Sequence, residues 1–265
     1  MTPPAAEDAA SLVTPADHRL AMDLADEAGR LLVELRDRLS AAGAPAGELK
    51  AEGDRRANDL LMERLAQLRP DDAVLSEEGR DGTGPSDTGR LASRRVWIVD
   101  PLDGTREFSE PPRPDWAVHV ALAVDGVAVA GAVALPSQGR TLSTLMPSPL
   151  PPPPPPRPRV IVSRTRRPAV AIRLAEALGA DLVEMGSAGA KVAAVVTGDA
   201  DIYAHSGGQY EWDSCAPVAV AVAAGLHVTR IDGGPMLYNN PDPYLPDLLV
   251  CHPTLAPAVT ALLDQ

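Results

Sequence analysis

This chain of 265 residues contains very little cysteine and few aromatic residues. Its two cysteines, Cys215 and Cys251, lie far apart, so they build neither a disulfide framework nor a cysteine-rich zinc site. We therefore expect a protein of a reducing compartment, the cytoplasm. Because the chain has one Phe, three Trp and four Tyr, we expect a hydrophobic core made mainly of Ala, Val and Leu.

The chain also has few basic residues. It contains 24 Lys and Arg and 36 Asp and Glu, which gives a formal net charge of −12. This sign argues against a nucleic acid polymer or an anionic membrane as partner. The N-terminus has no basic stretch followed by a long apolar run, so we expect no signal peptide and no membrane anchor. An acidic chain is compatible with a cation-dependent site for a small phosphate, because a bound metal reverses the local charge.

Two amphipathic helices are expected in the first part of the chain. Thr14 is a good N-cap with Pro15 after it, and apolar residues then recur every three or four positions until about Gly43. After a loop to Gly53, Asp54 fits the N-cap of a second helix that stops before Pro70. The apolar face of this second helix is expected to include Ala57, Leu61, Leu65 and Leu68.

Two buried strands are expected to end at acidic residues. Residues 73–76 are a short apolar run that ends at the pair Glu77-Glu78. Residues 96–99 are a second run, and it ends at Asp100 because Pro101 has no N–H to give to a sheet. The two runs predict neighbouring carboxylates at the ends of strands.

A hairpin and a lid are expected around these strands. Residues 116–124 and 127–135 alternate around an Asp-Gly turn, which is a strong hairpin signal, and residues 141–145 are a candidate third strand. The glycine-rich residues 79–89 have the composition of a mobile loop, which in an enzyme acts as a lid. We interpret His119, within the hairpin, as a structural histidine rather than a ligand.

The second half begins after a proline-rich segment, residues 147–158, which holds nine prolines. Such a run favours a stiff polyproline II spacer that cannot enter a sheet. We therefore predict an N-terminal α+β lobe over 14–146, a connector over 147–158 and a C-terminal α/β lobe over 159–265. Strands and helices are expected to alternate in the last lobe: strands at 160–163, 181–184, 201–204, 226–231 and 248–251, and helices at 168–178, 188–197, 214–224 and after Pro253.

The stretch Trp97 to Thr105, WIVDPLDGT, concentrates the chemistry of the chain. A buried strand delivers Asp100 and Asp103 to a turn, and Thr105 is a good N-cap for the segment that follows. Carboxylates suit a hard cation such as Mg²⁺, and a helix N-terminus suits an anion. The stretch could therefore hold a metal-bound phosphate. The alternative, which an isolated Asp-x-x-Asp-Gly favours, is that Asp103-Gly104 is only a turn and Asp100 only caps the end of a strand.

This string resembles the signature of the inositol monophosphatase superfamily of metal-dependent phosphatases, and the following REF resembles its CysQ-type branch. The resemblance implies a layered αβαβα sandwich. Trp212-Asp213, before a helix of small residues, resembles the second signature of the superfamily. The implied ligands of two or three Mg²⁺ ions are the carboxylates of Glu77, Asp100, Asp103 and Asp213 and the carbonyl of Leu102.

The resemblance also assigns catalytic and substrate-binding roles. Thr105 is expected to hydrogen-bond the attacking water, with Glu77 and Asp54 helping to take its proton. Gly186 to Lys191 resembles a G-S-x-x-x-K element in which Lys191 suits a second phosphate, although family members often have Ser where this chain has Ala188 or Gly189. The expected substrate-binding residues are Gly104, Thr105, Arg106, Ser163, Arg164, Gly186, Ser187, Lys191 and Tyr210.

The expected activity is hydrolysis of 3'-phosphoadenosine 5'-phosphate to AMP and phosphate, which serves sulfate assimilation, with inhibition by Li⁺. Inositol monophosphatase and fructose-1,6-bisphosphatase activities remain alternatives, as does a non-catalytic phosphonucleotide-binding protein. The expected partner is a small phosphorylated molecule, and a homodimer is left open. A scaffold role of the proline run, as a Pro-x-x-Pro ligand, is a further alternative.

Overall fold

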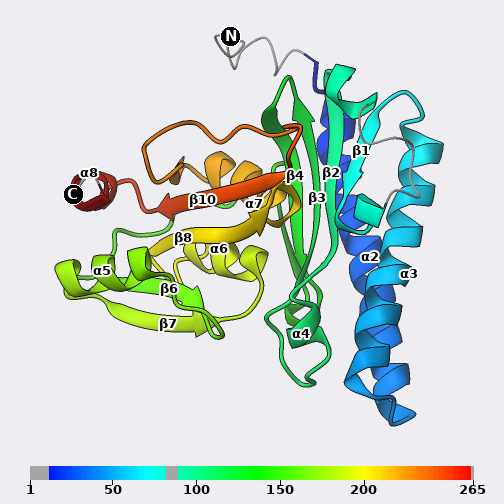
Figure 1. Ribbon diagram of the computed structural model, residues 1–265, viewed down its shortest axis with the longest axis horizontal. Helices are drawn as coiled ribbons and strands as arrows, with labels where there is room; N and C mark the ends of the chain where they lie inside the picture. Colours follow the sequence, from blue (N-terminus) through cyan, green and yellow to red (C-terminus); the bar gives the residue numbers. More distant parts are fainter. Residues whose placement is uncertain (1–11, 82–88, 264–265) are drawn as a thin grey trace.

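The computed structural model describes residues 12–81 and 89–263, which form two five-stranded sheets and the helices around them (Figure 1). One apolar cluster lies between the N-terminal helices and the first sheet, a second between the two sheets, and a third beyond the second sheet. Helices and sheets therefore alternate in five layers, and the expected αβαβα sandwich is confirmed. In the described residues, no helix is long and apolar enough to cross a membrane.

The outer layer of the first sheet is a pair of long helices, α2 (Pro15–Ala41) and α3 (Ala46–Leu68). The expected start of the second helix was wrong, because α3 begins at Ala46 and Asp54 lies in its interior. Gly53 lies inside α3 and does not break it. A Cβ at this position would stand 2.8 Å from Leu102 Cδ2, so the contact with the sheet requires glycine. It allows α3 to approach the sheet closely. Leu68 was also misplaced on the apolar face, as it is 48% exposed.

The first sheet has the order β1-β2-β3-β4-β5, with β1 parallel to β2 and the other neighbours antiparallel. Its strands are β1 (Ala73–Ser76), β2 (Arg95–Asp103), β3 (Ala117–Val124), β4 (Val127–Leu135) and β5 (Arg140–Ser143). The short 3-10 helices η1 (Glu77–Asp81) and η2 (Gly89–Ala92) follow β1, and η3 (Pro136–Gln138) precedes β5. The lid expected over 79–89 therefore falls partly on η1 and partly on residues 82–88, outside the described residues.

Strand β2 continues past Asp100, where we expected it to end. Its pairing with β3 shifts register between Asp100 and Asp103, and Pro101 sits in that irregularity, where no ladder bond is lost. Gly104 then takes a left-handed conformation, with φ of 87°, and caps the short helix α4 (Thr105–Phe108). Thr105 is thus the first residue of α4 rather than its N-cap, which corrects the expectation.

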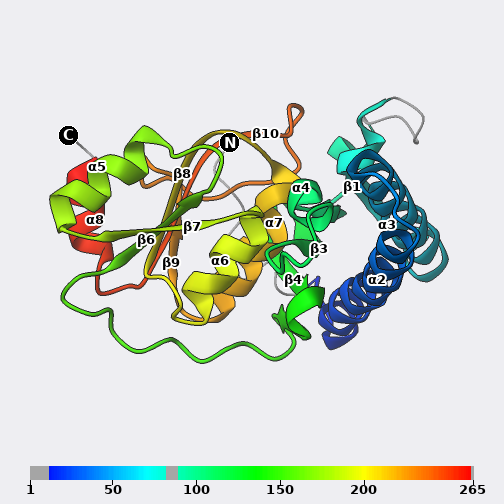
Figure 2. The same ribbon diagram turned by 90° about the horizontal axis from the view of Figure 1, so that it is seen from below.

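Residues 147–158 carry no helix or strand and join β5 to the second sheet (Figure 2). Every third residue, Ser148, Pro151 and Pro154, is half-buried, while the prolines between them are exposed. This spacing matches the three residues per turn of polyproline II. The carbonyl of Pro151 lies 3.2 Å from Nε2 of His252. The division into lobes on either side of this strap stays our proposal.

The second sheet has the order β7-β6-β8-β10-β9. Strand β8 runs on to Tyr210 through Gly207 and Gly208, where we expected a strand ending at Ala204. Helix α7 begins at Glu211, so Asp213 is its third residue and not its cap as expected. The elements are β6 (Arg159–Ser163), α5 (Ala169–Leu178), β7 (Asp181–Met185), α6 (Ala188–Val196), β8 (Ile202–Tyr210), α7 (Glu211–Ala223), β9 (His227–Thr229), β10 (Tyr244–Cys251) and α8 (Ala256–Leu263).

Candidate metal and phosphate site

Three aspartates meet between the two sheets. Asp100 and Asp103 lie at the end of β2, and Asp213 comes from the first turn of α7. One carboxylate oxygen of each lies within 4.8 Å of the others, and they are the one such acidic group of three among the residues described. The side chain of Asp213 is fixed because its Oδ2 accepts the Tyr210 N–H at 2.6 Å. Residues over a hundred positions apart thus form one cluster.

The electrostatics of this cluster favour a cation. Burial, with the neighbouring Glu77, Asp103 and Asp213, raises the pKa of Asp100 well above its usual range. Burial and the charge of Asp103 raise the pKa of Asp213 to about 7. Buried like charges of this kind repel one another unless a metal or protons neutralise them. The donors are all carboxylate oxygens, so the residues present fit a hard cation.

Asp103 behaves differently, because it is surrounded by hydrogen-bond donors. Its carboxylate accepts bonds from Ser187 Oγ at 2.5 Å, from Gly189 N at 2.6 Å and from Ala188 N at 3.1 Å, all at the start of α6. Burial alone would raise its pKa, but His119, Lys191 and Ser187 lower the pKa of Asp103 well below its usual value. Asp103 therefore stays ionised and ties the end of β2 to the start of α6.

Thr105 faces the acidic cluster together with Asp54 and Glu77. Its Oγ1 lies 3.3 Å from Asp54 Oδ1 and 3.1 Å from the carbonyl oxygen of Leu102. Burial and Glu78 raise the pKa of Asp54 to about 7. Burial, Asp213 and Asp54 raise the pKa of Glu77 to about 7, although its oxygens fall outside the group of three aspartates. These carboxyls can therefore exchange protons near neutral pH.

Comparison with known proteins identifies the family of the chain. The model of the inositol monophosphatase family matches residues 16–147 and 159–264, nearly the whole chain. The chain belongs to the inositol monophosphatase family. The expected resemblance is thereby confirmed. The match leaves out residues 148–158, so most of the proline strap lies outside the family pattern.

Within the inositol monophosphatase family, several similar proteins carry related names. The 3'-phosphoadenosine 5'-phosphate phosphatase of Mycobacterium leprae is 47% identical over 94% of each chain, and that of Mycobacterium tuberculosis is 48% identical over 87% of each. The 3'(2'),5'-bisphosphate nucleotidase CysQ of Escherichia coli is 31% identical over 71% of this chain and 79% of its own.

Solved structures of the same family share the fold. CysQ from Bacteroides thetaiotaomicron superimposes with a TM-score of 0.74, at 25% identity, over 91% of this chain and 98% of its own. Inositol monophosphatase II from Staphylococcus aureus gives a TM-score of 0.75, at 20% identity, over 95% and 97%. The layered architecture is therefore that of the family.

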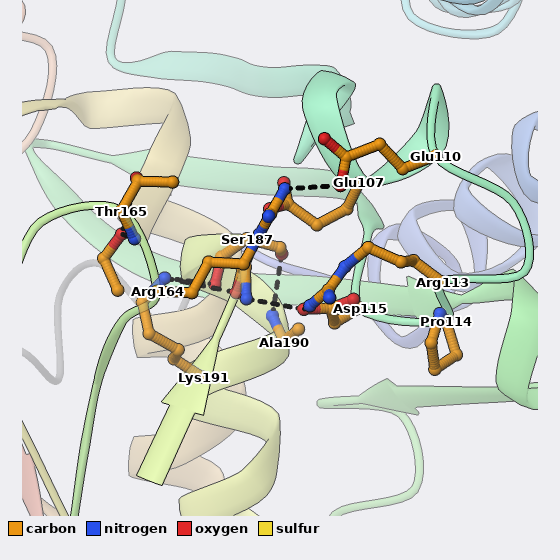
Figure 3. Close-up of polar contacts among 12 residues, drawn as sticks. Glu107, Glu110, Arg113, Pro114, Asp115, Arg164, Thr165, Ser187, Ala190 and Lys191 are labelled. Carbon is orange, nitrogen blue, oxygen red and sulfur yellow. Dashed lines mark hydrogen bonds and ion pairs between the residues drawn. The ribbon is translucent and has the colours of Figure 1, made fainter. Parts of the chain in front are cut away.

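The residues that the resemblance assigns to a second phosphate lie at the start of α6. The Lys191 ammonium donates to the carbonyl oxygens of Ser187, at 2.5 Å, and Gly186, at 3.2 Å (Figure 3). It also lies 5.5 Å from the centroid of the Tyr203 ring. Lys191 is buried, with 5% of its surface exposed. Burial lowers its pKa, while Asp103 and Asp213 act to raise it. Lys191 is therefore a buried cation beside the acidic cluster.

Other expected substrate residues are engaged within the protein. Arg164 donates to Glu107 Oε1 at 2.5 Å and to Glu110 Oε2 at 2.8 Å (Figure 3). Tyr210, expected to bind substrate, stacks on the Trp212 ring, with 4.9 Å between the ring centroids and 9° between the planes. Of the rest, Ser163 Oγ lies 3.2 Å from Thr165 Oγ1, and Arg106 is exposed at the start of α4.

The sequence did not point to the residues that hold the Gly186-Ser187 turn in place. Asp115 Oδ2 accepts the Gly186 N–H at 2.6 Å and also pairs with Arg113 (Figure 3). Glu107 packs so close to Gly186 that a Cβ there would lie 2.2 Å from Glu107 Cδ. We had read Glu107 only as part of the REF string. The one available signal was an Asp directly before a buried strand.

Proposed function

We propose that this chain hydrolyses 3'-phosphoadenosine 5'-phosphate to AMP and phosphate with Mg²⁺, two or three ions per site. The observation that carries the proposal is the convergence of Asp100, Asp103 and Asp213 opposite Thr105. The names of two similar mycobacterial proteins support the nucleotide substrate. We further propose the cytoplasm as the compartment, because both cysteines are buried free thiols.

The metal is held by this chain's carboxylates. We assign the ligands as Glu77, Asp100, Asp103 and Asp213, together with the carbonyl oxygen of Leu102. When bound, Mg²⁺ supplies Lewis-acid stabilisation of the phosphoryl oxygens and lowers the pKa of water. Three of these carboxyls already lie within one group, and two have a pKa raised to about 7. Binding of Mg²⁺ at neutral pH therefore displaces protons from these two carboxyls.

The chain's own groups then orient water and substrate. Thr105 Oγ1 stands between Asp54 and the Leu102 carbonyl and hydrogen-bonds the attacking water. Asp54 and Glu77, with pKa values near 7, take the proton that this water loses. The N–H groups of Gly104 and Thr105 open helix α4 and bind phosphate oxygens. The water oxygen bonds to phosphorus as the ester P–O bond breaks, and the ribose 3'-oxygen leaves and takes up a proton, equivalent to the one that Asp54 or Glu77 received from the water.

A left-handed Gly104 is essential to this cradle. A Cβ at this position would stand 3.1 Å from Ser187 Cβ and 3.2 Å from the Trp116 Cα, and φ is 87°. Both the conformation and the space therefore select glycine. The turn brings the N–H groups of α4 to the start of α6, where Lys191 is placed to neutralise a second phosphate.

A phosphate-release panel tests the substrate assignment. We expect the bisphosphate nucleotide to be hydrolysed faster than inositol 1-phosphate or fructose 1,6-bisphosphate, because Lys191 adds a buried cation beside the first phosphate site. Li⁺ is expected to inhibit and removal of Mg²⁺ to abolish turnover. Inositol 1-phosphate is the second candidate, since solved family members from Staphylococcus aureus bind inositol monophosphate and 2'-AMP. Faster hydrolysis of inositol 1-phosphate or fructose 1,6-bisphosphate than of the bisphosphate nucleotide would overturn the nucleotide assignment.

Replacing Thr105 tests the water-orienting role. Thr105→Val keeps the shape of the side chain and removes the hydroxyl, so kcat is expected to fall roughly 10²-fold. Thr105→Ser retains the hydroxyl and serves as the matched control, with much smaller loss. The measurement is steady-state phosphate release at saturating Mg²⁺. Equal rates for the Val and Ser variants would contradict the role.

A further inference from the structure

His119 lies where both ligand-bearing segments meet. It sits on β3 directly opposite Asp100 of β2, and its side chain has no exposed surface. Its Nε2 is 3.2 Å from Asp103 Oδ2, and its Nδ1 is 3.0 Å from the carbonyl oxygen of Trp212, the residue before Asp213. One imidazole ring therefore touches the carboxylate of one expected ligand and the backbone beside another.

Gly189 makes the room for this ring. A Cβ at position 189 would stand 2.0 Å from His119 Nε2, a distance that no side chain tolerates. Gly189 also donates its N–H to the same Asp103 Oδ2, at 2.6 Å. The N–H of Gly189 and the Nε2 of His119 thus both contact Oδ2 of Asp103. The imidazole occupies the space that a larger residue on α6 would fill.

We propose that His119 is a positioning residue that holds Asp103 and the first turn of α7 so that the three aspartates converge on a metal ion. The inference rests on the proposed metal role of Asp103. His119 acts through its neighbours and does not itself ligate the metal. Hydrogen-bonding partners of ligand carboxylates commonly set metal affinity, by about 10–100-fold.

Two amide variants separate positioning from core filling. In His119→Gln the amide nitrogen reaches the place of Nε2 beside Asp103, whereas in His119→Asn it reaches only the place of Nδ1. We expect the Gln variant to bind Mg²⁺ nearly as the wild type and the Asn variant to bind about 10–100-fold more weakly. The measurement is the Kd for Mg²⁺, by calorimetry on metal-free protein without substrate.

The Kd of Asp103→Asn for Mg²⁺, measured in the same way, separates the ligand role of Asp103 from the positioning role of His119. Wild-type Mg²⁺ affinity in Asp103→Asn would overturn the proposed ligand set itself. Loss of affinity there, with wild-type affinity in His119→Asn, would overturn only the role of His119. Gly189→Ala tests the same contact without changing the histidine, because its Cβ must push the ring from Asp103. It is expected to weaken Mg²⁺ binding, and an unchanged Kd would also overturn the inference.

Discussion

Asp100→Asn is expected to lower Mg²⁺-dependent phosphate release by ~10³-fold or more, because it removes one ligand charge from a site worth several kcal/mol of charge stabilisation. The amide keeps the size of the carboxylate and can still accept the Leu102 N–H, which Asp100 Oδ1 accepts at 3.1 Å. The measurement is the turnover number at saturating substrate over a Mg²⁺ titration.

Thermal unfolding of the metal-free variant provides the control. Burial and the neighbouring carboxylates raise the pKa of Asp100, so its ionised form destabilises the fold without metal. Asp100→Asn is therefore expected to unfold at the wild-type temperature or above it. An inactive variant that also melts far below the wild type would reflect misfolding, and near-normal turnover would contradict the ligand assignment.

Mg²⁺ affinity is expected to depend steeply on pH, weakening about 100-fold from about pH 8 to about pH 6. The pKa values of Asp54, Glu77 and Asp213 are all raised to about 7, from ordinary values near 4. Without metal, the folded state therefore keeps protons that the unfolded chain has released, and stability from these groups falls as pH rises from about 4 to about 7. Of the three, Glu77 and Asp213 are assigned as ligands, so Mg²⁺ must displace their two protons, and each costs about tenfold between pH 8 and pH 6.

The test is the rise in melting temperature on adding Mg²⁺, measured at several pH values. His205, whose pKa is lowered to about 4, changes the melting temperature equally with and without Mg²⁺. The effect of such histidines therefore cancels when the two melting temperatures are subtracted. We expect a small rise near pH 6 and a large rise near pH 8. A rise that does not change with pH would show that these carboxyls do not bind the metal. Asp213→Asn is expected to flatten the profile.

Local sequence was enough to predict much of the site. The Pro101 and Gly104 positions mark the irregular strand end and the left-handed turn, and both act within a few residues of the aspartates they place. Asp213 was found through the resemblance of Trp212-Asp213 to the second signature of the superfamily, because a helix start alone does not single out a metal ligand. The family resemblance then supplied the αβαβα order of the layers, which the structure and the comparisons confirm.

The errors came from contacts that join distant parts of the chain. Gly53 resembles a helix stop, but packing against Leu102 and Phe108 makes it part of the interior of α3. The burial of Lys191, which is 5% exposed, likewise depends on packing and not on its neighbours in the sequence. The donors around Asp103 and the bond from Asp115 to Gly186 lie about seventy or more residues away in sequence. No periodicity or motif carries information of that kind.

The packing of α7 has a consequence for how this gene can change. Helix α7 belongs to the second half of the chain, yet it packs on β3 and β4 of the first sheet and so brings Asp213 to Asp100. Noncovalent packing, and not the peptide link through residues 147–158, assembles the site. Since longer loops cost little in closure entropy, that link is free to lengthen, shorten or gain prolines between lineages. The enzyme would tolerate even a split gene whose two products meet along α7.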